Sequence, residues 1–166
     1  MIKLTHFLTQ SEDRKERAQE LVKQSALMNF AKMATILIEL FGCDPAFKRI
    51  GKREGQIIEM FFIDLEGSIY ITLVSDRNNF KCHYGKSENP KAVISVKGER
   101  EKAIKMISKV ICFKDNLFGL IRILPLFIRR KIKIKGSYFA AIKLCRCMMV
   151  GKHPMYKRKV EAYSWL

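Results

Sequence analysis

The sequence predicts an α+β domain, in which a five-stranded, mostly antiparallel sheet carries helices over one face and a long helix precedes it. Three observations predict this class. Apolar residues recur at helical spacing before residue 42, four short runs of strand-forming residues follow between residues 56 and 96, and one strictly alternating run lies at 130–135. The resulting order of elements is α-β-β-β-β-α-α-β-α, which is typical of a sheet with helices segregated to one side.

A long helix is predicted to begin at Thr9–Glu12, where the spacing matches a capping box. Its first turns are charged, and Gly42 and Pro45 are expected to end it. Its apolar face has helical spacing and comprises Leu27, Phe30, Ala31, Ala34, Leu37, Ile38 and Phe41. Residues 1–43 are therefore expected to form a helical extension that packs on the following domain.

Three strands are predicted next, at residues 56–64, 68–74 and 80–84, separated by short polar turns. Such short connections predict an antiparallel meander. A loop containing Pro90 then leads to a fourth strand at 92–96.

The spacing of apolar residues returns to a helical period after the fourth strand. Residues 99–113 are predicted to form a helix, and residues 116–128 form an almost wholly apolar helix that Gly119 and Pro125 should bend. The fifth strand spans 130–135, and a last helix spans 138–150. Residues 44–150 are thus predicted to form the domain, and residues 151–166 a basic, aromatic tail.

The charge of the chain is unusually positive. Its 166 residues contain 32 Lys and Arg against 16 Asp and Glu, so the formal net charge is +16. Residues 129–166 alone carry eleven basic residues and one acidic residue, a local excess of 11 − 1 = 10. A partner that carries negative charge is expected, and an anionic membrane, nucleic acid and an acidic protein all qualify.

The chain shows no pattern that predicts a catalytic, metal or cofactor site. Cys82 and His83 are adjacent in a strand, so their side chains should point to opposite faces. Cys145 and Cys147 should lie on different faces of a helix, which disfavours a zinc site. We therefore expect a binding protein and not an enzyme. Five cysteines without regular spacing, and a start without a secretory segment, predict a cytoplasmic protein.

Three segments resemble the sterol carrier protein type-two (non-specific lipid transfer) family. They are Ile63-Asp-Leu-Glu-Gly-Ser-Ile-Tyr-Ile71, Glu88-Asn-Pro-Lys-Ala-Val-Ile-Ser95, and Lys131-Ile-Lys-Ile-Lys-Gly-Ser-Tyr138 followed by residues 140–144. The resemblance extends from about residue 44 to residue 150 and keeps the order of elements. It implies an apolar tunnel, enclosed by the sheet and its helices, for fatty acyl chains, acyl-CoA or sterols.

The resemblance and the apolar segments together predict which residues line the tunnel. The sheet would form its floor, and residues 117–128 and 139–149 its walls and lid. The predicted lining residues are Phe61, Ile63, Ile71, Leu73, Leu117, Phe118, Ile121, Leu124, Phe127, Ile128, Phe139, Leu144 and Met148. Residues 117–128 fit equally a buried core helix, and an interface with another protein is a further alternative.

The predicted function is binding, and intracellular transfer, of a lipid or fatty-acyl-like molecule. The basic C-terminal region would dock on an anionic membrane through Arg129, Arg130, Lys131, Lys133, Lys135, Lys157, Arg158 and Lys159. A nucleic-acid-binding module that uses the same basic residues is the alternative.

Overall fold

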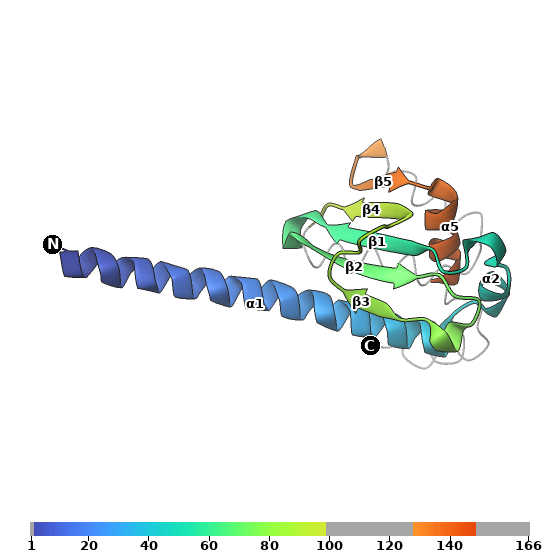
Figure 1. The fold of residues 1–166 in the computed structure, drawn as a ribbon, viewed down its shortest axis with the longest axis horizontal. Coiled ribbons are helices and arrows are strands. Elements are labelled where there is room, and N and C mark those ends of the chain that lie inside the picture. Colours follow the sequence, from blue (N-terminus) through green and yellow to red (C-terminus); the bar gives the residue numbers. More distant parts are fainter. Residues whose placement is uncertain (1, 99–127, 149–166) are drawn as a thin grey trace, which may run out of the picture.

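The computed structural model describes residues 2–98 and 128–148 (Figure 1). Its elements are α1 (Ile2–Phe41), α2 (Asp44–Lys48), β1 (Ile57–Phe62), β2 (Gly67–Thr72), β3 (Cys82–Tyr84), β4 (Ala92–Val96), β5 (Ile132–Gly136) and α5 (Tyr138–Cys147). The predicted helices at 99–113 and 116–127 and the tail from residue 151 lie outside the described residues.

The described strands form one five-stranded sheet in the order β3-β2-β1-β4-β5. Three of its pairings are antiparallel, and β1 pairs with β4 in parallel. The predicted five-stranded, mostly antiparallel sheet is therefore confirmed, and so is the antiparallel meander of its first three strands. The chain reaches β4 by crossing the sheet between residues 85 and 91, which places β4 beside β1 instead of beside β3 (Figure 1).

The two faces of the sheet differ in character because alternate side chains point to opposite sides. On the inner face, Ile58 and Met60 of β1 lie beside Ile94 of β4 and are buried. Ile132 and Ile134 of β5 continue this face. The outer face carries the alternate residues, which include exposed lysines on β5.

The described helices cover only the inner face (Figure 1). The rings of Phe30 on α1 and Phe62 on β1 meet edge to face, with centroids 5.3 Å apart. On the same face, α5 packs against β4 and buries Leu144 in the same cluster. For the described helices, this arrangement confirms the segregation to one face that the sequence predicts for an α+β domain.

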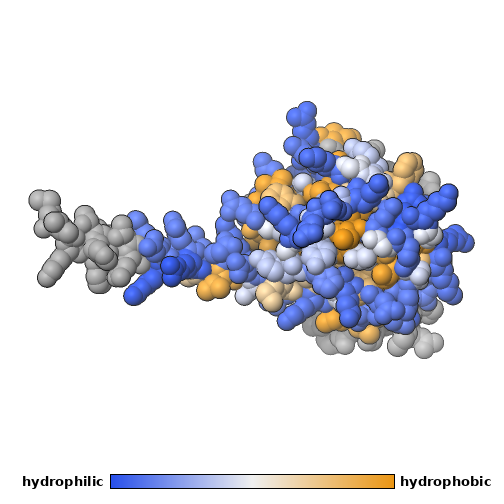
Figure 2. Space-filling model, in the orientation of Figure 1, coloured by the Kyte–Doolittle hydropathy of each residue, from blue (hydrophilic) through white to orange (hydrophobic). Residues whose placement is uncertain are grey.

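Helix α1 starts earlier than predicted. It runs from Ile2, so Thr9 lies inside the helix and the predicted start at the Thr9–Glu12 capping box is wrong. A capping box acts only where the chain before it leaves helical geometry, and here the preceding residues are helical too. Residues 12–20 are all exposed, and hydrophilic residues cover this projecting part of the helix (Figure 2). The predicted end is confirmed, with the Gly42 N–H donating to the Ile38 carbonyl at 2.7 Å.

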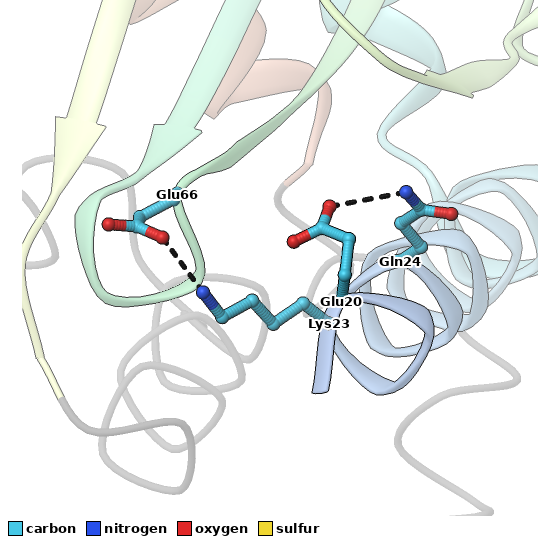
Figure 3. Close-up of polar contacts among 4 residues, drawn as sticks. All are labelled: Glu20, Lys23, Gln24 and Glu66. Atoms are coloured by element: carbon cyan, nitrogen blue, oxygen red, sulfur yellow. Dashed lines mark hydrogen bonds and ion pairs between the residues drawn. The ribbon is translucent and has the colours of Figure 1, made fainter. Parts of the chain in front are cut away.

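The second half of α1 is fastened to the sheet by apolar and polar contacts. Its buried side chains include Leu27, Ala31 and Ile38, as predicted. The Lys23 ammonium donates to the Glu66 carboxylate at 2.8 Å, which joins α1 to the turn between β1 and β2 (Figure 3). Each group stabilises the charge of the other, so the pKa of Lys23 is raised and that of Glu66 is lowered.

The short helix α2 follows directly after the end of α1. The sequence predicts Pro45 only as a stop signal, whereas in the structure Pro45 lies in the first turn of α2. Proline is favoured there because its missing N–H has no partner at a helix start and its φ is already helical. Gly42 therefore marks the end of α1, and Pro45 marks the beginning of α2.

The turn from β5 into α5 depends on two adjacent residues. Gly136 has φ +91°, a value that favours glycine, and its Cα faces the backbone of Lys91 and Ala92. The Ser137 hydroxyl then accepts a hydrogen bond from the Ala140 N–H at 3.3 Å and caps α5. Both residues act as the sequence predicts, and they turn α5 back across the inner face.

Candidate ligand-binding interior and basic surface

Four predicted tunnel residues lie together in the interior. Ile71 and Leu73 come from β2 and the residue that follows it, and both are fully buried. Leu144 and Met148, at the end of α5, are buried in the same cluster. The fold therefore places these predicted sheet and helix positions in one buried cluster.

Four other predicted tunnel residues are placed differently. Phe61 alternates with Met60 and Phe62, so it lies on the outer face and is half-buried. Ile63 is half-buried in the turn after β1. Ile128 and Phe139 are 73% and 71% exposed. The sequence assigned Phe61 to the floor by residue type, although the two-residue period of the strand separates it from Ile71.

The remaining predicted lining residues, Leu117, Phe118, Ile121, Leu124 and Phe127, lie outside the described residues. So do Lys157, Arg158 and Lys159 of the predicted membrane contact.

The basic residues of β5 and the turn before it form a cationic border of the sheet. Lys131, Lys133 and Lys135 are exposed and alternate with inward-pointing isoleucines. Arg129 and Arg130 are exposed just before the strand. In the described part of the sheet β5 is an edge strand, and such lysines also hinder edge-to-edge pairing with other chains.

A buried carboxylate on the outer face escapes sequence analysis. Glu59 on β1 is 7% exposed and accepts hydrogen bonds from the Ser68 hydroxyl at 2.6 Å and the Ser87 N–H at 3.3 Å. The second bond fastens the crossing between β3 and β4 to the sheet. The only signal in the sequence is a charged residue inside an apolar run, and this signal does not name its partners.

A surface cleft of about 410 Å³ lies beside α2. It is lined by Asp44, Phe47, Lys48, Ser75, Asp76, Arg77 and Asn78. The Arg77 Nε atom lies 3.0 Å from an Asp44 oxygen, so these two charged groups of the cleft pair with each other.

The thiols of the interior are poor nucleophiles. Burial raises the pKa of Cys82 to about 12, against a smaller opposing effect of its hydrogen bond with Thr35. Burial likewise raises the pKa of Cys147 to about 12 and that of Cys145 to about 11. Because the thiolate is the reactive form, these cysteines stay protonated near neutral pH.

These raised pKa values predict a loss of stability at alkaline pH. Thiols of the unfolded chain ionise near pH 9, whereas those of the folded protein stay protonated. The protonated thiols therefore contribute fully to the free energy of unfolding below about pH 9, and this contribution is lost as the pH rises toward 12. Between about pH 8 and pH 10, each thiol should cost roughly 1 kcal/mol of unfolding free energy. Urea titrations across this range measure the slope. In the variant C82A/C147A, the free energy of unfolding should fall less steeply with pH. An unchanged pH dependence would show that these thiols do not cause the loss of stability.

Within residues 2–98 and 128–148, no three His, Cys, Asp or Glu side chains are grouped to hold a metal ion. In the same part of the chain, no helix combines the length and the apolar composition that crossing a bilayer requires.

The fold is similar to that of a solved SCP2 protein. No protein-family model matches the sequence, and no curated protein matches it. The structure is similar to the ubiquinone synthesis protein UbiJ-SCP2, with a TM-score of 0.50 and 8% identity over 75% of this chain and 93% of that one.

Two insect proteins match more weakly. Sterol carrier protein domain 2 of Helicoverpa armigera has a TM-score of 0.44 and 22% identity, over 71% of this chain and 86% of its own. Sterol carrier protein 2 like 2 of Aedes aegypti has a TM-score of 0.36 and 16% identity, over 69% and 95%. The similarity to UbiJ-SCP2 confirms the resemblance seen in the sequence at the level of architecture: this chain has the fold of sterol carrier protein type-two domains.

Proposed function

We propose that the protein binds a lipid-class apolar ligand between the inner face of the sheet and its helices, and carries it between intracellular membranes. The observation that carries this proposal is the fold, because it matches that of UbiJ-SCP2 over most of both chains. Ile71, Leu73, Leu144 and Met148 would contribute to the ligand site. The sequence also predicts apolar lining residues at 117–127, which lie outside the described residues.

Burial of apolar surface would drive uptake, at about 25 cal/mol for each Å² removed from water. A ligand held in this way needs no reactive group from the protein. The raised pKa values of Cys82 and Cys147 mean that neither thiol is poised to act as a nucleophile. The same free thiols suit a reducing compartment, and we place the protein in the cytoplasm.

Docking on an anionic membrane would bring the carrier to its donor and acceptor. The net charge of +16 and the exposed lysines of β5 support this part of the proposal. Each basic residue near an anionic surface contributes about 1 kcal/mol. Lys131, Lys133 and Lys135 would therefore add attraction without disturbing the interior.

Native mass spectrometry of freshly purified protein, followed by organic extraction, tests the proposal. We expect a co-purifying lipid of defined mass. Copurification of nucleic acid with an otherwise empty protein would contradict it.

A matched pair of variants locates the ligand site. Met148→Gln keeps the side-chain volume but places an amide in the interior, so the affinity of the delipidated protein for a fluorescent fatty acid should fall at least about tenfold. Met33→Gln makes the same change on the exposed side of α1 and should bind as the wild type does. Equal affinities for both variants would remove α5 from the proposed site.

A further inference from the structure

A second cationic surface lies at the end of the sheet where α2 and α5 pack together (Figure 1). We name it the basic corner, and it comprises Lys48 at the end of α2, Arg49, Lys52 and Arg53 just after it, and Lys143 and Arg146 on α5. Two contacts hold its halves together. The Lys143 ammonium donates to the Arg49 carbonyl at 3.0 Å, and the Arg53 guanidinium lies 5.8 Å from the centroid of the Phe139 ring.

Among the described residues, none of the six cations of the basic corner forms an ion pair. Residues 45–53 and 128–148 contain no Asp or Glu. Two acidic residues flank the first segment: Asp44 forms an ion pair with Arg77 at 3.0 Å, and the Glu54 carboxylate accepts a hydrogen bond from the Ser75 N–H at 3.0 Å. Six like charges held in one place repel each other, and a partner with several negative charges relieves this repulsion.

Large exposed rings adjoin these charges. Phe139 is 71% exposed and Tyr138 is 59% exposed, both in the first turn of α5. Phe139, Lys143 and Arg146 follow each other at helical spacing and so share one side of α5. Rings that reach the headgroup level beside cations that meet phosphates are the features of an interfacial surface.

We propose that the basic corner docks on an anionic phospholipid bilayer, with Phe139 as the side chain that inserts. This inference rests on the proposed function, since a lipid carrier must meet a membrane. In this proposal, Phe139 contacts the membrane and does not line the tunnel. One face of its ring already lies under Arg53, which leaves less room for stacking a nucleic-acid base than for burying the exposed ring among acyl chains.

Co-sedimentation with vesicles of phosphatidylglycerol and phosphatidylcholine tests the docking surface. Arg49→Gln combined with Lys52→Gln removes two exposed charges, and vesicle affinity should fall about fivefold for each charge, or about 25-fold in all. Phe139→Ser should reduce affinity about tenfold. Vesicles of phosphatidylcholine alone should bind only weakly.

Matched controls make the same changes elsewhere. Lys81→Gln combined with Lys86→Gln removes two exposed charges away from the corner, and Ile36→Ser removes an exposed apolar side chain from α1. Each should retain most of the vesicle affinity of the wild type.

A corner variant that binds no worse than its control overturns the proposal. So does selective release from vesicles by inorganic phosphate over chloride at equal ionic strength, which would indicate a site for free phosphate. The proposal would also be overturned if the corner variants lost binding to single-stranded RNA but kept their vesicle binding.

Fatty-acid binding in vesicle-free solution separates this inference from the proposed function. The R49Q/K52Q and Phe139→Ser variants should take up the fluorescent fatty acid as tightly as the wild type. Vesicle docking without any fatty-acid binding in the wild type would refute the carrier function and leave the surface in place. If the wild type binds the fatty acid but the corner variants bind vesicles as well as the wild type does, the docking surface is refuted and the carrier function stays in place.

Discussion

Replacing Gly136 with valine is expected to lower the free energy of unfolding by at least about 3 kcal/mol. The residue has φ +91°, outside the range that residues with a Cβ adopt at low cost. An added Cβ would also meet the Lys91 carbonyl oxygen and lie 3.2 Å from the Ala92 Cα, both of which belong to the backbone and cannot turn aside. Valine would therefore force β5 away from β4 and displace the start of α5.

Urea unfolding measures this effect, and Gly98→Val provides the control. Gly98 follows β4, and a Cβ at this position meets no atom within 4 Å. The control should unfold within about 0.5 kcal/mol of the wild type. Equal stability of the two variants would show that the turn tolerates a different backbone path and would contradict the account given for Gly136.

Phe80→Ala is expected to cost about 3–5 kcal/mol, because it empties a fully buried site. The Phe80 ring meets that of Phe47 edge to face, with centroids 5.8 Å apart and an angle of 89°. Phe47 comes from α2 and Phe80 lies two residues before the start of β3, so the pair joins the segment after α1 to the edge of the sheet. Water that filled the site of either ring would face the apolar side chains around it.

A double-mutant cycle separates the pair from simple burial. Phe47→Ala and Phe80→Ala together should cost about 1 kcal/mol less than the sum of the single variants. Phe139→Ala makes the same substitution at a position 71% exposed and should change stability by less than about 1 kcal/mol. Strict additivity at Phe47 and Phe80 would mean that the two rings contribute independently.

The sequence was informative where a local pattern determines the structure. Alternation at Ile132 and Ile134 predicted which face of β5 is buried, and Gly136 followed by Ser137 predicted the turn and the cap. Gly42 predicted the end of α1 within one residue. Each of these features depends on neighbours in the chain, so no knowledge of distant contacts was needed.

Features that depend on distant residues were not predictable in the same way. The parallel pairing of β1 with β4 arises from a crossing without a helix, whereas the usual sequence sign of a parallel pair is a helix between its strands. The basic corner joins residues 49 and 143, which lie 94 positions apart. A single sequence shows that both segments are basic, but it does not show that they meet.

The site was predicted in part for the same reason. Ile71 and Leu144 were chosen for apolar character and do share one buried cluster. Phe61 was chosen on the same ground, yet its position in β1 directs it to the outer face. Counting alternate residues from Phe62 would have separated the two faces, so this difference was within reach of the sequence.

The parallel position of β4 has a consequence for the newly made chain. The meander of β1 to β3 closes through short turns, and such local pairings form quickly. β4 can then join β1, but its own partner β5 starts 36 residues after β4 ends, between Val96 and Ile132. Until that stretch has been synthesised, Ala92–Val96 presents a β-branched, apolar edge to other nascent chains. Lys91 and Lys97 flank this segment, and charges in such flanking positions oppose aggregation during the interval.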